Sequence, residues 1–335
     1  MKKLNVGIIG LGVGRHHVLS FGSHPQCRVI SLCDFSSERL KEMGREFPHI
    51  QTTENAEDIL TDPGIDIVSI ASFDNYHFSQ TVEALHQNKH VFVEKPLCLF
   101  REEAAGIRDL LWEKQSLLLS SNLNLRTCPR FKWVRSTIRS GEMGQIFYIG
   151  ADYLWGRIQK LTHGWRKEMP YYSILYGAAV HMIDLVIWLL GEKPVEVQGY
   201  GNHIATEGSD FRHNDFAALL LKFGNGIIAN INANGGCVHP HFHKLSVYGT
   251  QGTFAHDING AWLFKTRDPD HGAQEIMEAY PGEDKHQVIH SFVDAIVNRD
   301  VEPLVPADDI FTVMSICFAA EDSVTRNIPV SINYI

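Results

Sequence analysis

The sequence predicts an α/β protein with two domains. The first has a parallel, doubly wound sheet, and the second is an α/β domain with a large, mostly antiparallel open sheet. Three observations predict this architecture. At 335 residues the chain is long enough for about two domains. Up to Asn122, short apolar runs alternate with amphipathic helical segments, as in parallel sheets. Beyond Asn122, longer runs separated by glycine turns replace that pattern.

For the first domain, residues 1–122, the sequence predicts a regular series of alternating strands and helices. We expect strands over 4–10, 27–34, 65–72, 90–94 and 116–122, and helices that begin near Gly14 or cover 36–47, 79–89 and 101–115. Ser36 is a suitable N-cap for the second helix. The 65–72 run is nearly all apolar, which is typical of a strand buried on both faces.

The second domain, residues 123–335, begins at a boundary that we expect near 122–128. We predict helices over 130–140, 179–191, 285–299 and 306–325, and strands over 144–155, 195–201, 215–223, 226–234 and 242–249. Gly191 should end its helix. The turns "FGNG" and "YGTQG" favour antiparallel pairing. Residues 156–176 are expected to be irregular and aromatic.

Composition excludes several classes of protein. The net charge is −9 and no Lys/Arg block occurs, so nucleic acid and anionic membranes are not expected partners. No run of about 18 apolar residues is present, so no membrane span is expected. The six cysteines are scattered without a C-x-x-C motif, which indicates reduced thiols in a cytoplasmic protein.

The stretch "GLGVGRHH" (10–17) indicates a dinucleotide site. It follows a strand and opens a helix, and Asp34 ends the next strand 22 residues after Gly12, where an acid would bind a ribose hydroxyl. The spacing is G-x-G-x-G, with Arg15 where the third glycine usually lies. Either the loop is one residue shorter, or Arg15 packs at the helix start, where it would also reach phosphate. The competing interpretation is an ordinary turn of a parallel-sheet protein.

Over nearly its full length the chain resembles the Gfo/Idh/MocA oxidoreductases, the glucose–fructose oxidoreductase and inositol dehydrogenase family. The matching stretches are "VGIIGLGVGRHH", "DIVSIASFDNYHFSQTVEALHQNKHVFVEKPL", "NLRTCPRF", "SGEMGQI", "HMIDLVIWLLGE", "LSVYGTQGT" and "SFVDAIVNRDVEPLV". The resemblance implies a Rossmann domain and NAD(P)-dependent oxidation or reduction of a sugar or cyclitol carbon. It also implies an open sheet that packs in a homodimer or homotetramer.

"VFVEKPL" (91–97) carries the most specific part of this resemblance. Its strand ends at the carboxyl edge, where parallel sheets bind ligands. The resemblance implies that Lys95 lies beside the nicotinamide and hydrogen-bonds the reacting hydroxyl, with Pro96 fixing the turn. The alternative is a solvated lysine at a strand end.

The expected cofactor contacts come from the glycine loop and from the ends of the strands. They are Gly10, Gly12, Val13, Gly14, Arg15, Asp34, Ser72, His77, Glu94, Lys95 and Asn124. Asp34 favours NAD over NADP because its charge would repel a 2′-phosphate. Ser36, Ser37 and Arg39 follow it, however, and offer groups that bind phosphate.

"HMID" (181–184) supplies the expected base, His181, since imidazole titrates near neutrality. Asp184 shares its helix face and either orients His181 or is structural. The family commonly carries Asp four residues before this histidine, whereas Gly177 stands there in "GAAVH". Either His181 acts alone with Lys95, or a group on the substrate replaces the acid. Without the resemblance, a core histidine is an equally good interpretation.

Two further polar groups have no assigned role. His239, His241 and His243 alternate in "HPHFH", which indicates a strand facing substrate or another subunit more than a zinc site. The second group is a set of aromatic and cationic side chains. It fits either a binding site for a sugar that carries a carboxylate or phosphate, or a packed loop at a subunit interface. It comprises Tyr153, Trp155, Arg157, Lys160, His163, Trp165, Arg166 and Tyr171.

The leading hypothesis is therefore an NAD-dependent dehydrogenase acting on CH–OH groups of a small sugar, cyclitol or sugar derivative, with no metal. One alternative is a glycosidase of this fold that uses NAD as a transient oxidant. The other is a non-catalytic NAD(P)-binding sensor or assembly protein. Net NADH formation distinguishes the first from the second, and Lys95 together with His181 argues against the third.

Overall fold

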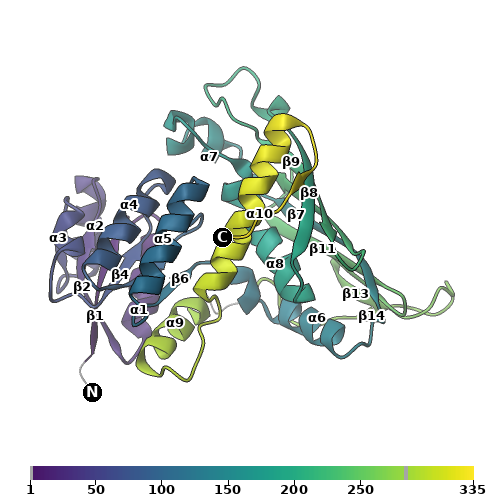
Figure 1. Ribbon diagram of the computed structural model, residues 1–335, viewed down its shortest axis with the longest axis horizontal. Helices are drawn as coiled ribbons and strands as arrows, with labels where there is room; N and C mark the ends of the chain where they lie inside the picture. The colour runs from purple at the N-terminus through teal and green to yellow at the C-terminus, as the bar shows by residue number, and fades with distance from the viewer. Residues whose placement is uncertain (1–2, 283–285) are drawn as a thin grey trace. The chain divides into compact units, whose positions relative to one another are not determined.

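The computed structural model describes residues 3–282 and 286–335, which form two compact units (Figure 1). The first comprises the described residues of Met1–Asn124 and Glu283–Met314, with Ile335. The second comprises Leu125–Gly282 and Ser315–Tyr334. In the described part of the chain, no helix is both long and apolar enough to cross a membrane. The six cysteines are free thiols.

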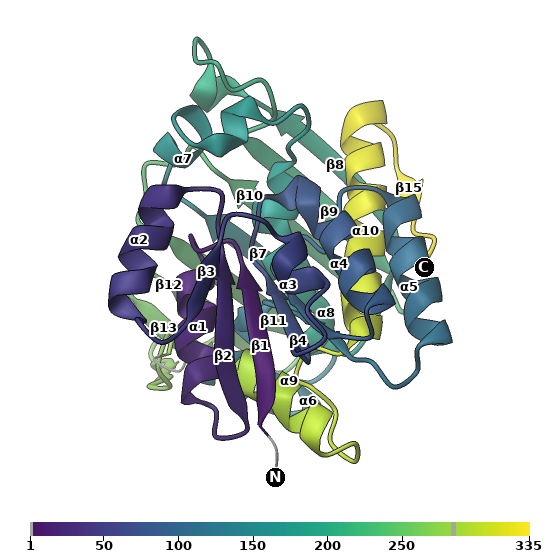
Figure 2. The same cartoon turned by 90° about the vertical axis from the view of Figure 1, so that its left-hand side faces the viewer.

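The first unit contains a six-stranded, wholly parallel sheet in the order β3-β2-β1-β4-β5-β6. Figure 2 shows β3, β2, β1 and β4 side by side. The strands are β1 (Leu4–Ile9), β2 (Cys27–Cys33), β3 (Gln51–Thr53), β4 (Ile67–Ile70), β5 (His90–Val93) and β6 (Leu119–Ser121). The strand order reverses direction at β1 and β4, so their carboxyl ends flank the crevice where such sheets bind ligands.

Helices connect successive strands of this sheet. They are α1 (Gly14–Ser23), α2 (Ser37–Glu46), α3 (Glu57–Leu60), α4 (His77–His86) and α5 (Arg101–Glu113). Right-handed crossovers place α1 and α2 on one face and α3, α4 and α5 on the other. Ser36 caps α2 by accepting a hydrogen bond from the Arg39 amide, as the sequence predicts. The short elements β3 and α3 were not predicted, because each is too brief to show periodicity.

The helix α9 (Gln287–Val297) packs on α1 of the first unit. His24 Nε2 lies 3.1 Å from Asp294 Oδ1, and Ser20 Oγ lies 2.8 Å from His286 Nδ1. The sequence assigned these late residues to the second domain, since it followed chain order. Of the predicted range 285–299, residue 285 lies outside the described residues.

The second unit contains a nine-stranded sheet in the order β14-β13-β12-β11-β7-β10-β9-β8-β15. Its strands are β7 (Ile146–Leu154), β8 (Pro194–Asn202), β9 (Phe216–Phe223), β10 (Ile228–Asn234), β11 (Phe242–Gly249), β12 (Thr253–Asp257), β13 (Gly260–Phe264), β14 (Gln274–Glu275) and β15 (Val330–Ser331). All neighbours are antiparallel except β7 and β10, which confirms the mostly antiparallel sheet. The sequence missed β12 to β15, which are short and lie among polar turns.

One face of this sheet is covered within the unit. The helices of this second unit are α6 (Pro129–Arg139), α7 (Gln159–Thr162), α8 (Val180–Leu190) and the second half of α10 (Ala307–Arg326). The helix α8 contacts β7 and β10, where Ile149, Ala151 and Ile231 are fully buried. A π-helical turn, Leu175–Ala179, leads directly into α8. Gly191 ends α8 in the left-handed conformation, as predicted.

Candidate active site

The glycine loop leaves an open cradle at the start of α1. Gly10 has φ +86°, and a Cβ there would lie 2.3 Å from the Ala71 carbonyl oxygen, so only glycine fits. A Cβ at Gly12 would meet nothing within 4 Å. Val13 is exposed beside it. The amino end of α1 is therefore accessible to an anionic group, which the helix dipole favours.

Gly14 and Arg15 resolve the unusual spacing of this loop. A Cβ on Gly14 would lie 3.3 Å from Ile8 and 3.4 Å from Ala71, so Gly14 lets α1 pack closely on β1. The Arg15 guanidinium forms an exposed ion pair with Glu46 of α2, with Nε 2.9 Å from Oε2. Of the two interpretations, the structure favours a loop shortened by one residue, in which Gly14 performs the packing role of the third glycine.

Asp34 is buried at the end of β2 and holds the neighbouring loops. The amides of Leu11 and Ser36 donate hydrogen bonds to its two oxygens at 2.8 and 2.9 Å. Arg39 adds an ion pair at 3.1 Å. Three of the roughly four acceptor positions of the carboxylate are then occupied, which leaves room for about one further donor such as a ribose hydroxyl.

Glu94, directly after β5, is the centre of a buried polar network. Its Oε1 accepts from Asn122 Nδ2 at 2.7 Å and lies 3.1 Å from His17 Nε2, while the Lys95 amide donates to Oε2. Burial alone would raise the pKa of Glu94. Hydrogen bonding and charge from His17, together with the Lys95 cation and Asn122, outweigh burial and lower this pKa to about 2. A fixed negative charge therefore lies next to Lys95 in the chain.

The loops after β4 and β5 are tied together by His77. Its Nδ1 lies 2.6 Å from the Pro96 carbonyl oxygen and its Nε2 lies 3.2 Å from that of Ser72. The Lys95–Pro96 peptide bond is cis. His77 is fully buried, so its role is to hold the two loops together and not to contact a ligand directly. Asn124, the last residue of this part of the unit, is exposed.

In the second unit, His181 belongs to a cluster of rings. The imidazole stacks on Tyr153 of β7, with ring centres 5.7 Å apart and planes at 8°. Tyr153 also contacts His241 at 5.1 Å and His243 at 4.9 Å. Tyr153 thus joins two motifs that the sequence singled out separately. The sequence analysis placed Tyr153 in the aromatic and cationic group, but nothing in the sequence related it to His181 or to the histidines of "HPHFH".

His243 and His256 extend this cluster in neutral form. The Tyr280 hydroxyl accepts from the His243 amide and donates to its Nδ1 at 2.7 Å. Burial, with smaller effects of His241 and His256, lowers the pKa of His243 to about 3. Arg130 can only donate, so Nδ1 of His256, 3.2 Å away, accepts. Burial and the Arg130 charge lower the pKa of His256 to about 4. The sequence analysis missed Tyr280 and His256, which lie in no motif.

His239, the first histidine of "HPHFH", does not share this environment. His239 Nδ1 lies 2.7 Å from the Pro240 carbonyl oxygen, and its ring packs against Phe242. Within residues 3–282 and 286–335, no group of three or more histidine, cysteine, aspartate or glutamate side chains is arranged to hold a metal ion.

Asp184 is fully buried and faces Arg126. Arg126 Nε lies 3.0 and 3.1 Å from the two carboxylate oxygens, and Nη2 also donates to Oδ1. Of the two roles that the sequence left open for Asp184, this bidentate pair favours the structural one, because it anchors α8 to the segment before α6.

Aromatic rings surround Arg166 in the irregular segment. Its guanidinium lies 4.4 Å from the ring centre of Trp165, 5.1 Å from Trp155 and 5.7 Å from Tyr172. Burial, with the charges of Arg157 and Arg166, lowers the pKa of Lys160. The expected concentration of cations and aromatic rings is therefore present, and Trp155 and Trp165 of the predicted group hold Arg166.

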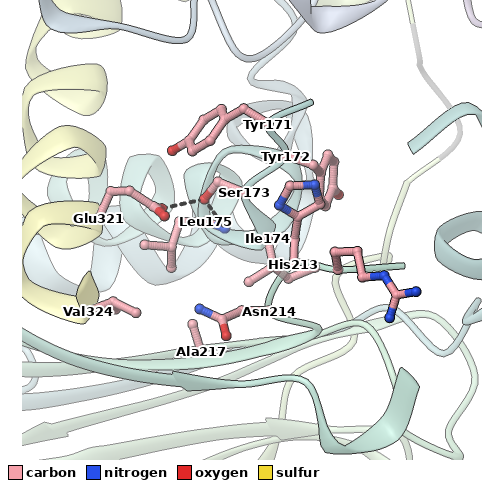
Figure 3. Close-up of a pocket in the computed structure, with 11 residues that line it drawn as sticks. Tyr171, Tyr172, Ser173, Ile174, Leu175, His213, Asn214, Ala217, Glu321 and Val324 are labelled. Atoms are coloured by element: carbon pink, nitrogen blue, oxygen red, sulfur yellow. Dashed lines mark hydrogen bonds between the residues drawn. The ribbon is translucent and has the colours of Figure 1, made fainter. Parts of the chain in front are cut away.

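A cavity of about 220 Å³ lies next to this segment. Figure 3 shows Tyr172 and His213 on one side and Glu321 of α10 on the other, with the Tyr171 hydroxyl turned towards Glu321 and Ser173 hydrogen-bonded to it. Burial raises the pKa of Glu321, although hydrogen bonds from Ser173 and Tyr171 oppose the shift. The cavity is smaller than the roughly 300–1,000 Å³ of drug-sized sites.

Comparison with protein families agrees with both units. Residues 4–122 match the model described as "Oxidoreductase family, NAD-binding Rossmann fold", and residues 131–255 match "GFO/IDH/MocA C-terminal domain". The chain belongs to the Gfo/Idh/MocA family. As a member, it is an oxidoreductase-family protein with an NAD-binding Rossmann domain. The parallel sheet of the first unit and the open sheet of the second are the two domains of that family.

Two individual proteins and one solved structure are similar over 82–100% of the chain. The uncharacterized oxidoreductase YrbE of Bacillus subtilis is 24% identical over 350 residues, covering 99% of this chain and 98% of that protein. Myo-inositol 2-dehydrogenase of Thermotoga maritima is 22% identical over 289 residues, covering 82% and 81%. The structure of levoglucosan dehydrogenase with NADH and levoglucosan has a TM-score of 0.88 at 21% identity, covering 100% of both chains.

Proposed function

We propose that the protein is an NAD-dependent dehydrogenase that transfers a hydride between nicotinamide and a secondary alcohol carbon of a sugar, cyclitol or sugar derivative. The observation that carries this proposal is the Glu94 network beside Lys95. This network lowers the pKa of Glu94 to about 2, so a carboxylate lies next to Lys95 at the carboxyl edge of the parallel sheet. A lysine at this strand end would favour alcohol oxidation, because its charge stabilises the negative charge that develops on the alcohol oxygen as the hydroxyl proton is removed.

The residues of the first unit suit NAD. The open backbone at Gly12 and the amino end of α1 would take the pyrophosphate, and Asp34 would accept from the adenine ribose. When bound, NAD supplies the hydride acceptor. The chain's own contribution is to hold the loops that carry Ser72 and Pro96, through His77, and to fix the backbone of Lys95 through Glu94.

In this proposal both Lys95 and His181 act on the hydroxyl group of the substrate. Lys95 donates a hydrogen bond to the oxygen and stabilises its developing charge. His181 removes the hydroxyl proton, since neutral imidazole is a base near pH 7. Its ring orientation is constrained by the stacked Tyr153. Asp184 contributes through Arg126, by holding the helix that carries His181.

The test begins with the purified full chain and NAD. A panel of monosaccharides, anhydrosugars, cyclitols and nucleotide-sugars is screened for NADH by absorbance at 340 nm. We expect stoichiometric NADH from at least one polyol. A bond-cleaving reaction without net NADH would instead support the glycosidase alternative. NAD binding without turnover of any compound would support the sensor alternative.

Two variants then test the assignment of residues on the identified substrate. Lys95→Ala and His181→Ala should each lower turnover by about 10²-fold or more, as expected for removal of one charge-stabilising group or base. NAD binding should persist in both. The exposed residues Lys41 and His86 provide matched controls as Lys41→Ala and His86→Ala. Near-normal turnover of both active-site variants would refute the assignment.

A further inference from the structure

A buried chain of hydrogen bonds runs from Ser69 of β4 through His17 of α1 to Glu94. His17 Nδ1 lies 2.8 Å from Ser69 Oγ, and His17 Nε2 lies 3.1 Å from Glu94 Oε1. The order of groups is that of a serine–histidine–carboxylate triad. Ser69 is fully buried inside the sheet, however, so its hydroxyl cannot attack a substrate. The chain must therefore act on Glu94 and not through Ser69.

The proton positions in this chain follow from the chemistry of its members. Glu94 is ionised, because its pKa is lowered to about 2, and a carboxylate can only accept hydrogen bonds. His17 Nε2 therefore carries a proton and donates to Glu94. The Ser69 hydroxyl can donate to Nδ1 of a neutral imidazole or accept from an imidazolium. The hydrogen bond from His17 to Glu94 is consequently kept in both charge states of the ring.

His17 maintains the negative charge of Glu94. Burial raises the pKa of this carboxyl group, and the hydrogen bond and charge of His17 are the largest effects that lower it. The Lys95 cation acts in the same direction, and Asn122, which follows β6, adds a neutral hydrogen bond. Without His17, burial would be opposed less strongly and the pKa of Glu94 would rise.

A carboxylate at this strand end affects the two redox forms of nicotinamide differently. The oxidised ring carries a positive charge, whereas the reduced ring is neutral. Lys95 alone would repel the oxidised ring, but Glu94 and Lys95 together have no net charge. Loss of the Glu94 charge would leave one uncompensated cation, which disfavours the oxidised ring and has little effect on the reduced one.

We propose that Glu94, with His17 as its positioning residue, determines the preference of the nicotinamide site for the oxidised over the reduced cofactor. This inference rests on the proposed place of the nicotinamide beside Lys95. The structural alternative is that Ser69, His17 and Glu94 only tie α1 to the strands β4 and β5.

The first test is Glu94→Gln, which removes the charge and keeps the size of the side chain. Dissociation constants for NAD⁺ and NADH are measured by calorimetry on the full chain. We expect the ratio Kd(NAD⁺)/Kd(NADH) to rise about tenfold or more, because a like charge then faces the oxidised ring. A loss of affinity that is common to both forms, such as partial unfolding would cause, cancels in this ratio.

Two further variants control for lost contacts and for lost charge elsewhere. Glu94→Asp keeps the charge but shifts the hydrogen bonds, so its ratio should stay close to that of the wild type. Glu142→Gln removes the charge of an exposed ion pair with Lys265 and should also leave the ratio unchanged. An equal change in Glu94→Gln and Glu94→Asp, or no change in either, would establish the structural alternative and overturn the proposal.

The second test separates the two hydrogen bonds of His17. A glutamine amide reaches as far as Nε2 and keeps a donor for Glu94, whereas an asparagine amide reaches only as far as Nδ1, near Ser69. In His17→Asn the pKa of Glu94 should rise, so the carboxylate is lost as the pH falls. Its Kd ratio should equal that of the wild type at about pH 8 and approach that of Glu94→Gln at about pH 6.

His17→Gln should stay near the wild-type ratio at both pH values, because the donor to Glu94 is kept. His86→Asn, at an exposed position, is the matched control. A Kd ratio in His17→Asn that is the same as in the wild type at both pH values would show that His17 does not maintain the charge, and would refute its assigned role.

These measurements separate this inference from the proposed function. If Lys95→Ala abolishes turnover of an alcohol while Glu94→Gln leaves the Kd ratio unchanged, the role of Glu94 is wrong and the dehydrogenase stands. If the wild-type protein oxidises no alcohol but Glu94→Gln still raises the ratio, the dehydrogenase is wrong and the role of Glu94 in cofactor binding stands.

Discussion

Arg126 and Asp184 form a bidentate ion pair inside the second unit, with side chains 3% and 1% exposed. The pair joins the residues just before α6 to the middle of α8, 58 positions later in the chain. Both charges have lost their water, so each depends on the other for compensation. The position of α8, and with it of His181, depends on this contact.

Replacing one partner of this pair should strongly destabilise the protein. We expect Asp184→Leu or Arg126→Met to lower the free energy of unfolding by about 3–5 kcal/mol, because an uncompensated buried charge remains. The double variant Arg126→Met/Asp184→Leu should lose less than the sum of the two single variants. Urea unfolding of all forms measures this coupling. Simple additivity would show that the pair contributes nothing as a unit.

The protein should bind NAD(H) more tightly than NADP(H), because Asp34 presents a carboxylate where a 2′-phosphate would lie. Titration of tryptophan fluorescence with each cofactor checks this, and tighter NADP(H) binding would contradict it. Asp34→Ser should shift the preference towards NADP(H), since Arg39, now paired with Asp34, would be released for the phosphate. Adding Arg39→Gln should abolish that gain.

Stability should decrease as the pH falls from about 6.5 towards 4. The pKa values of His243 and His256 are lowered to about 3 and 4 in the folded chain, whereas the unfolded residues titrate near 6.5. Below pH 6.5 the unfolded state therefore binds more protons, at a cost of up to about 1.4 kcal/mol per pH unit for each group. The stabilisation is complete above pH 6.5 and is lost on acidification.

Urea unfolding at a series of pH values tests this dependence. A His243→Gln variant should show a shallower loss of unfolding free energy between pH 6.5 and 4, by about one bound proton. His86→Gln, at an exposed position, is the matched control and should keep the wild-type slope. Equal slopes in all three proteins would show that His243 is not responsible.

We further predict that the protein self-associates through the uncovered face of the nine-stranded sheet. That face carries Tyr148, Asp152, Asn230, Asn232, Lys244, Ser246 and Tyr248, which line a shallow hollow. It is polar with two central tyrosines, which suits a hydrated subunit interface. Light scattering at micromolar concentration should give a mass above that of the monomer. Tyr148→Lys should reduce this mass, and Trp112→Lys, an exposed change in the first unit, should not.

Local sequence patterns were sufficient for much of the architecture. The alternation of apolar runs and helical segments predicts the parallel sheet, since each element shows its own periodicity. The glycine turns predict the antiparallel strands of the second unit for the same reason. "GLGVGRHH" and "VFVEKPL" mark the expected cofactor and lysine positions, because the turn and the strand end are encoded by neighbouring residues.

Only the tertiary structure decided which distant groups meet. Arg126 meets Asp184, Tyr153 stacks on His181, and α9 packs on α1, although no spacing or motif relates these segments. The glycine at 177 is the sharpest case. In the sequence Gly177 is a missing acid, whereas in the fold its space is taken by Tyr172. Periodicity records which face of an element is buried. The partner on that face is determined by the packing of the whole chain.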